Sequence, residues 1–497
     1  MQAKTKKIIV FGLGAFLFVF GLVLGGCWFL LFSTILKSKL VLSPTSTSYD
    51  MWIETPIPMY MEFYLFNWTN AYMYDLNFPV ANRTKPEFKE LGPYVFSEHN
   101  KRVNLTWNSN DTVTFQQTRQ YVFRPELSSG SIDDKVTTVN VIAVAAAYFS
   151  RYDNIYFKII MDGFLEKLES ISTTHTVGEM LFDGYDDKLI DLATELHIQK
   201  FKLPFKKFAW FAERNNSASY DGWFNMHTGA GDVRNLGNLY AWNYAPRTPY
   251  YKSTCGLVRG STGELMPPVD GLDEIFVFSP DLCTSLSLVS QGDYETKGVV
   301  GTRFSADLRN LDNGTYFPEK SCYTSGTPVP AGALNISLCK WNAPAFVSYP
   351  HFYLADESYR GAVAGMRPNK SLHEFFLAVE PKTGIPLAVR ARMQLNILLQ
   401  PYQDMKMFKD LPRVFIPTLW FTQKADIDDS LASTAKLVLS APVIGWGTLF
   451  GLSAVGLLIL VVGLVVTVRH GWDRDDTREL ISKRRNKNSS PTPPPET

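Results

Sequence analysis

The chain has 497 residues, and its 49 Lys and Arg against 48 Asp and Glu leave a formal net charge of +1. Proteins that bind polyanions usually carry a basic excess or stripe, so this balance gives no reason to expect a nucleic-acid partner. Aromatic residues make up 14% of the chain. Because aromatic side chains favour strands and apolar interiors, we expect a strand-rich domain with a large core.

An apolar run without charged residues covers residues 8–32, after a short tail at 1–7 that contains three lysines. It exceeds the ~20 residues that a helix needs to cross a bilayer core. A cleaved signal peptide is the alternative, but its apolar region is about 7–15 residues long and ends at small residues. This run ends in the bulky segment 27–32, so we expect an uncleaved membrane helix.

A second apolar run covers residues 444–468 and precedes a tail at 469–497 that is rich in Arg and Lys. Basic residues next to a membrane span mark its cytosolic side. The C-terminal tail is therefore predicted to be cytosolic, and two spans then place the N-terminus there too. Residues 33–443 are predicted to form one domain on the other side of the membrane.

The first run contains Gly21 and Gly25 in a GxxxG pattern. Small residues at this spacing allow two membrane helices to approach closely. Glycine is also common on faces of membrane helices that contact lipid. The sequence leaves both interpretations open.

The central domain contains eight N-x-S/T sequons, which indicate a glycosylated surface on the non-cytosolic side. Their asparagines are Asn67, Asn82, Asn104, Asn110, Asn215, Asn313, Asn335 and Asn369.

Four cysteines lie close together within the same domain, namely Cys255, Cys283, Cys322 and Cys339. An even number in an oxidising compartment indicates two disulfides, and spacing alone does not choose among the three connectivities. A zinc site is the alternative, and the absence of any CxxC pair disfavours it.

The domain shows a mixture of strand and helix signals. Strand-like runs at 94–96 and 113–115 flank a predicted hairpin turn at 108–111, and 276–278 and 387–399 are also strand-like. Helical signals concentrate in residues 137–195, where apolar residues recur at helical spacing. The recurring sets are the apolar run 139–147, then Ile155, Ile159, Phe164 and Leu168, then Val177, Leu181, Tyr185 and Leu189. We expect an α+β fold with a helical cluster inserted into a strand-rich body.

Motifs for catalysis are absent from the sequence. There is no GxSxG nucleophile elbow, since 260–263 is a turn-like GSTG, and there is no phosphate-binding loop or HExxH. We therefore expect no enzyme activity, no cofactor and no metal site.

The C-terminal tail contains one sorting-type motif. Asp476, Leu480 and Ile481 fit the acidic dileucine pattern, in which a clathrin adaptor binds the apolar pair in a pocket and the carboxylate on a basic patch. Such motifs are addresses read by a receptor and not anchors. A chance match in a charged tail is the alternative.

Several stretches resemble the class B scavenger receptor family, in the right order and over nearly the whole chain. Some segments, such as FAERNNS at 211–217, are similar to the family's lipoprotein receptor. Others, such as THTV at 174–177, are similar to its lysosomal integral membrane protein, and an invertebrate member fits this mixture. The family stretches are LGPY at 91–94, GYD at 184–186, DLC at 281–283, YPHF at 349–352, EPKTGIP at 380–386 and PTLWF at 417–421.

The resemblance implies an irregular antiparallel β-barrel with a helical-bundle apex and an internal hydrophobic tunnel, anchored by two transmembrane helices. Fatty acids, sterols, sterol esters or carotenoids, delivered by lipoprotein particles, are the implied cargo. An apolar path lowers the barrier for lipid transfer, since exposing each methylene to water costs about 0.8 kcal/mol. The resemblance also implies disulfides that pair Cys255 with Cys322 and Cys283 with Cys339.

The apex differs from that of relatives with clustered lysines, since Lys167 stands between Glu166 and Glu169. Attraction of anionic particles by this patch is therefore not expected. The candidate ligand-binding residues are Lys167 and four apolar residues. Because helical apolar stripes usually face a core, we favour bundle packing for the apolar four. These are Ile155, Ile159, Ile160 and Phe164.

Three functions follow from this interpretation. The first is a scavenger-type receptor and lipid conduit at the plasma membrane or in endosomes and lysosomes. The second is a sorting receptor that carries a protein partner to lysosomes, and the third is recognition of apoptotic cells or microbes. All three are compatible with a monomer or a homo-oligomer.

Overall fold

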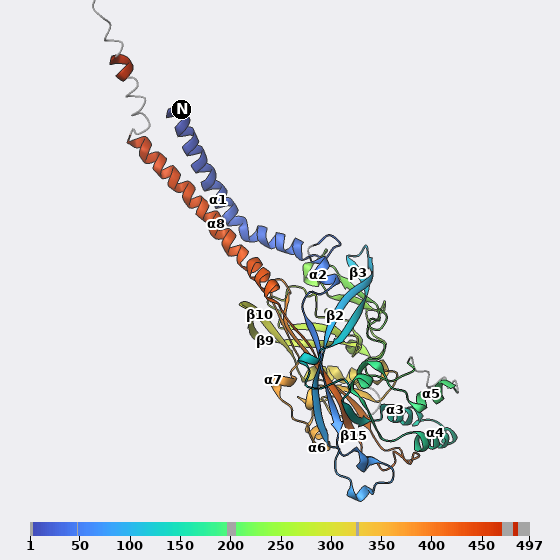
Figure 1. Ribbon diagram of the computed structural model, residues 1–497. Coiled ribbons are helices and arrows are strands. Elements are labelled where there is room, and N and C mark those ends of the chain that lie inside the picture. Colours follow the sequence, from blue (N-terminus) through green and yellow to red (C-terminus); the bar gives the residue numbers. More distant parts are fainter. Residues whose placement is uncertain (1–2, 47, 196–204, 325–327, 470–480, 486–497) are drawn as a thin grey trace, which may run out of the picture. The chain divides into compact units, whose positions relative to one another are not determined.

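The computed structural model describes residues 3–46, 48–195, 205–324, 328–469 and 481–485 (Figure 1). Contacts divide the chain into two compact units, one of Met1–Ser38 with Ser433–Thr497 and one of Lys39–Ala432. The first unit contains most of two long terminal helices. The second contains all the described strands.

The two long helices are α1 (Ala3–Leu40) and α8 (Asp429–Val468), and both are long and apolar enough to cross a membrane. Each includes one of the two apolar runs, 8–32 and 444–468, and continues beyond it as helix. The helices therefore accommodate the two expected spans.

The two helices approach each other closely within their unit. The Ser453 hydroxyl donates a hydrogen bond to the Phe18 carbonyl oxygen at 3.0 Å. A Cβ atom at Gly21 would overlap the carbonyl oxygen of Leu449. The structure therefore favours helix packing over lipid contact as the role of this glycine.

Within the described residues, thirteen antiparallel strands form one sheet in the order β7-β6-β3-β2-β1-β15-β14-β13-β10-β9-β8, with β12 pairing to β14 and β11 to β12. A separate pair is formed by β4 (Lys135–Val139) and β5 (Ser172–Thr176). The strands of the sheet are β1 (Met59–Trp68), β2 (Phe88–Trp107), β3 (Thr112–Phe123), β6 (Phe224–His227), β7 (Leu239–Trp242), β8 (Glu274–Ser279), β9 (Thr284–Thr296), β10 (Val299–Ala306), β11 (Leu334–Asn335), β12 (Ala345–Ser348), β13 (Phe376–Val379), β14 (Pro386–Leu399) and β15 (Val414–Asp426).

The sheet curls into a nearly closed barrel because one segment joins its two edge strands. The Leu239 amide on β7 donates to the Gly260 carbonyl at 2.8 Å, and the Phe278 amide on β8 donates to the Ser261 carbonyl at 2.8 Å. Gly260 has φ +73°, and a Cβ atom there would overlap the Phe276 carbonyl oxygen. Glycine is therefore required where the barrel closes.

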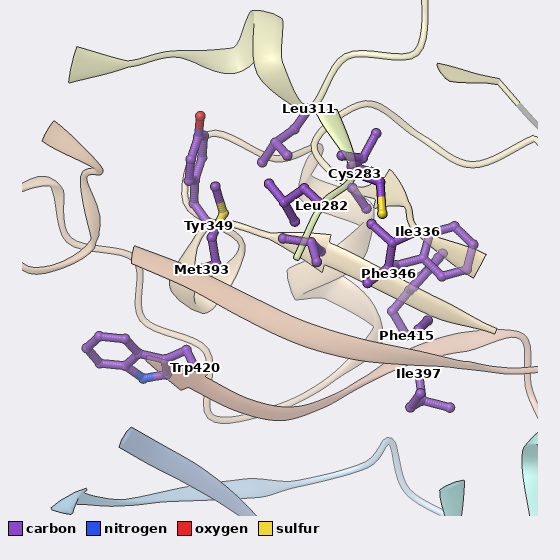
Figure 2. Packing of buried hydrophobic residues seen from close by; sticks show 14 of the residues in the cluster. Leu282, Cys283, Leu311, Ile336, Phe346, Tyr349, Met393, Ile397, Phe415 and Trp420 are labelled. Carbon is purple, nitrogen blue, oxygen red and sulfur yellow. The ribbon is translucent and has the colours of Figure 1, made fainter. Parts of the chain in front are cut away.

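The predicted strands at 94–96, 113–115, 276–278 and 387–399 all lie in this sheet, and β2 and β3 form the predicted hairpin. Side chains alternate between the two faces of a strand, so every second residue points inward. Figure 2 shows part of the resulting core, in which Leu282, Ile336 and Phe346 lie close together.

Three helices gather at one side of the barrel in Figure 1. They are α3 (Val141–Ser150), α4 (Ile155–Leu168) and α5 (Lys188–Glu195). Asn140 caps α3 by accepting a hydrogen bond from the Ala143 amide, as is typical of asparagine at this position. The remaining short helices are α2 (Tyr49–Ile53), α6 (Glu357–Ala362) and α7 (Lys370–His373).

The helical prediction for 137–195 is partly wrong. Its first residues belong to β4, which pairs with β5, so α3 begins only after Val139. Val177 and Leu181 are buried without forming a regular α-helix, because Leu181 belongs to a single π-helical turn at Glu179–Asp183. A strand end followed by one turn also directs these apolar side chains into the core.

The preferred bundle-core interpretation of Ile155, Ile159 and Ile160 is also wrong, since these side chains are 51%, 60% and 56% exposed. Helix α4 instead buries Met161 and Leu165. At 100° per residue these two groups lie on opposite sides of the helix, so α4 is apolar on both faces.

The apex helices are linked by a partly buried carboxyl group. The Asn140 side-chain amide donates to Glu169 Oε2 at 2.6 Å, which connects the start of α3 with the end of α4. Burial, and then the charge of Asp187, raise the pKa of Glu169 to about 7. The ionised form is thus disfavoured in the folded state.

We predict that the apex is more stable in mild acid. The folded pKa of Glu169 lies above its ordinary value of 4.5, so its stabilising contribution is complete below pH 4.5 and is lost as pH rises to about 7. Glu169→Gln should remove this loss and raise the melting temperature at pH 7.5 by about 1–3 °C. Scanning fluorimetry of the full chain between pH 4.5 and 7.5 measures the difference.

Glu126→Gln, at an exposed carboxylate in the 3-10 turn Pro125–Leu127, serves as the control. A Glu169→Gln profile that matches the wild-type profile at every pH would contradict this role of Glu169.

Candidate functional site

An apolar cavity of about 240 Å³ lies between the apex helices and the barrel wall. The helices contribute Ile142 and Ala145 from α3 and Met161 and Phe164 from α4. Because Phe164 is on the inner side of α4, this candidate from the sequence lies at the cavity and not on the exposed face.

The barrel contributes alternate residues of one strand. Met393, Leu395 and Ile397 on β14 all line the cavity, as does Phe421 on the neighbouring β15. Residues at this spacing point to the same side of a sheet. The alternation was therefore readable in the sequence at 387–399, but the sequence did not show which face encloses a cavity.

One end of the cavity is polar, where Glu213, Asp281 and Lys340 contribute to the lining. Arg214 contacts Asp281 at 3.0 Å, and Lys340 Nζ lies 3.7 Å from the other Asp281 oxygen. Burial raises the pKa of the Asp281 carboxyl, but the charges of Arg214 and Lys340 outweigh it and hold the pKa below its usual range. Asp281 is therefore ionised at neutral pH.

A buried ion network extends from this polar end into the barrel. Arg214 also lies 3.6 Å from Asp221, which contacts Arg119 at 2.8 Å. Arg119 in turn contacts Glu98 at 2.9 Å. Each charge is partnered by an opposite charge, as burial in an apolar interior demands.

The structure contains two disulfides, Cys283–Cys339 and Cys255–Cys322. These are the pairs that the family resemblance implies. Cys283–Cys339 joins the segment that carries Asp281 to the segment that carries Lys340. It therefore fixes the two charged residues on facing loops.

A second group of titratable side chains lies in the barrel wall. The rings of His351 and His373 stack with centroids 4.5 Å apart, and His351 Nε2 lies 2.5 Å from Glu90 Oε2. The Nδ1 atoms accept hydrogen bonds from the Arg367 and Asn369 amides. Burial and the neighbouring His351 lower the pKa of His373 to about 4, so its ring is neutral at physiological pH.

The sequon asparagines differ in exposure. Asn67, Asn313 and Asn335 are half-buried, and in Asn67 the side-chain oxygen accepts from the Thr137 amide at 2.8 Å. A glycan attaches to the nitrogen, which this bond leaves unused. The exposed sequon asparagines are Asn82, Asn104, Asn110, Asn215 and Asn369.

The other candidate residues lie apart from the cavity. Lys167 is exposed on α4. In the tail, Asp476 and Leu480 lie outside the described residues, and Ile481 is exposed. Among the described residues no group of three or more His, Cys, Asp or Glu side chains is arranged to hold a metal ion.

Comparison with known proteins places the chain in a family. The CD36 family model matches residues 12–467. Protein peste of Drosophila melanogaster is 35% identical over 94% of this chain and 83% of its own length. Scavenger receptor class B member 1 of Mus musculus is 32% identical over 92% of this chain and 89% of its own, and Lysosome membrane protein 2 of Homo sapiens is 29% identical over 87% of each. The chain therefore belongs to the CD36 family, the class B scavenger receptor family that its motifs resemble.

Proposed function

We propose that this chain is a two-pass membrane receptor that docks lipid-bearing particles and takes up their lipid through the barrel. One observation carries the proposal. Helix α4 lines an apolar cavity with its inner face and exposes apolar residues on its outer face. A single helix thus connects a lipid-compatible surface with a lipid-compatible interior.

The outer face of α4 and the loop before it form the docking face, which we define as Tyr152, Ile155, Tyr156, Ile159 and Ile160. All five side chains are more than half exposed. Tyrosine and aliphatic residues together suit the boundary between lipid and water, because the tyrosine ring can contact lipid while its hydroxyl is hydrated.

The charges on α4 favour an uncharged lipid surface as the partner. Lys158 pairs with Asp404 at 2.9 Å, and Glu166 pairs with Lys406 at 2.8 Å. Opposite charges in pairs produce little net field for attracting a charged particle. Binding would then depend on burial of the docking face.

The cavity supports transfer of lipid from such a particle. Each methylene of a lipid chain that is exposed to water costs about 0.8 kcal/mol of free energy. An apolar interior beside the docking face therefore lowers the barrier for moving the lipid out of the particle. We infer that the cavity belongs to a tunnel leading towards the membrane. The cargo classes remain fatty acids, sterols, sterol esters and carotenoids.

The membrane arrangement is part of the same proposal. Both termini are cytosolic, the barrel unit is glycosylated on the other side, and the protein resides at the plasma membrane or in endosomes and lysosomes. It acts as a receptor and not as an enzyme. Delivery of a protein partner to lysosomes is the second candidate, favoured by the tail motif.

Filling the cavity should block lipid uptake. We predict that Leu395→Trp lowers uptake of labelled sterol ester, fatty acid and carotenoid by cells. The larger indole would occupy space that the lipid needs, and each lipid methylene that it excludes costs about 0.8 kcal/mol of binding free energy, or roughly fourfold in affinity. Uptake is measured at equal surface level.

Val300→Trp is the matched control, since Val300 is exposed on β10 and does not line the cavity. Equal uptake by the Leu395→Trp and wild-type chains would contradict the proposal that lipid passes through the cavity.

A charge on the docking face should weaken particle binding. Ile159→Glu loses the burial of one aliphatic side chain, worth about 1.5–3 kcal/mol, or roughly a 10- to 150-fold loss of affinity. Binding of phosphatidylcholine-coated particles to cells measures it. Val80→Glu is the control, because Val80 is exposed and does not belong to the docking face. Equal binding by both variants would argue against this face.

Loss of the tail motif should redistribute the protein. Replacing Leu480 and Ile481 by Ala is expected to raise the surface level several-fold and deplete endosomes, because the adaptor pocket loses its apolar pair. Surface biotinylation and microscopy measure both pools, with Lys483→Ala as the control. An unchanged distribution would show that the motif is a chance match.

A further inference from the structure

We propose that Asp281 and Lys340 form the head-group site of the cavity and select lipids that carry an uncharged hydroxyl over lipids that carry a carboxylate. This inference rests on the proposed lipid-uptake function. It assigns a specificity role to the polar end.

Both side chains remain reachable from the cavity. Asp281 is 30% exposed and Lys340 25% exposed, whereas the neighbouring Arg214 is 2% exposed. The distance of 3.7 Å between Lys340 Nζ and Asp281 Oδ1 exceeds the range of a hydrogen bond. Within the described residues, no hydrogen bond uses Lys340 Nζ, so its donors are available to a ligand.

The charges around the pair balance only if Lys340 is included. Asp281 shares Arg214 with Asp221, and Asp221 shares Arg119 with Glu98. Three carboxylates thus meet two guanidinium groups, and the Lys340 ammonium supplies the missing positive charge. Glu213 also lines the cavity, but it is an exposed residue, so water screens its charge.

An anionic head group would disturb this balance. A fatty-acid carboxylate on Lys340 would place another negative charge beside Asp281 in apolar surroundings, which is costly. A carboxylate also has no proton to donate to Asp281. Both effects disfavour ionised fatty acids at this end.

A hydroxyl group matches the pair on both sides. Its oxygen accepts a hydrogen bond from Lys340 Nζ, and its hydrogen is donated to the Asp281 carboxylate. Hydrogen bonds to charged groups are stronger than those between neutral groups. The hydroxyl leaves the net charge of the network unchanged.

The backbone holds the site in a defined position. The Cys283–Cys339 disulfide lies two residues from Asp281 and next to Lys340. Trp341 adopts φ +52°, which a bulky residue rarely does, and its ring meets Phe205 edge-on at 5.6 Å. Both rings line the cavity beside the head-group site. Strain of this kind is characteristic of positions that a ligand site requires.

Two probes with the same sixteen-carbon chain test the inference. The full chain in phosphatidylcholine nanodiscs is titrated at pH 7.4 with labelled hexadecanol or labelled palmitate, and binding to empty nanodiscs is subtracted. The wild-type chain should bind hexadecanol at least about tenfold more tightly, which is the effect of one well-formed hydrogen bond to a charged group.

Two substitutions separate the contributions. Asp281→Asn keeps an oxygen for Arg214 but removes the negative charge, so palmitate affinity should rise about tenfold. Lys340→Met should lower hexadecanol affinity about tenfold. Lys409→Met, an exposed lysine outside the cavity, is the control and should change neither value.

Equal wild-type affinity for the two probes, or unchanged palmitate binding by Asp281→Asn, would overturn the head-group assignment while leaving lipid uptake intact. If the Asp281→Asn chain does not fold, as its melting curve would show, the wild-type preference and Lys340→Met decide the question. Failure of the wild-type chain to bind either probe, with uptake unaffected by Leu395→Trp, would overturn the proposed function itself.

Discussion

Closure of the sheet is the constraint on which the rest of the barrel unit depends. An open sheet of this length would bury its apolar face only by packing against another layer, and no interior space would remain. The Gly260–Ser261 segment instead joins β7 to β8, so the strands enclose their own core. An enclosed core can keep a cavity, because its walls are held by hydrogen bonds and do not depend on filling the centre.

The apex helices complete this enclosure, and α4 has the most demanding position. Its inner face must be apolar to meet the cavity, and its outer face is apolar although its isoleucines are more than half exposed. Exposed side chains of this size are unfavourable for a soluble surface unless a partner covers them. The polar end of the cavity is an equally unfavourable feature of the interior. Its buried charges carry a desolvation cost that apolar packing in the same place would avoid.

Much of this architecture was predictable from local patterns. The strands at 94–96 and 387–399 follow from β-propensity and alternation, and the two apolar helices follow from length. The outer face of α4 was misassigned because periodicity shows that Ile155 and Ile159 share a face but not what covers it. The Arg214–Asp281 contact joins residues distant in sequence, and the fold alone brings them together. The left-handed backbone at Trp341 likewise has no sequence signal, since tryptophan seldom adopts it.

The stacked histidines make the stability of the fold depend on pH in the range found inside an acidifying vesicle. His373 has a folded pKa of about 4, below its ordinary value of 6.5, so the unfolded chain takes up the extra proton first as pH falls between these values. Acid therefore lowers the stability of the fold through His373, whose Nδ1 accepts a hydrogen bond from the Asn369 amide. Glu169 responds in the opposite sense at the apex. In an acidifying compartment the two groups would offset each other: falling pH lowers the stability of the barrel unit through His373 and raises it through Glu169.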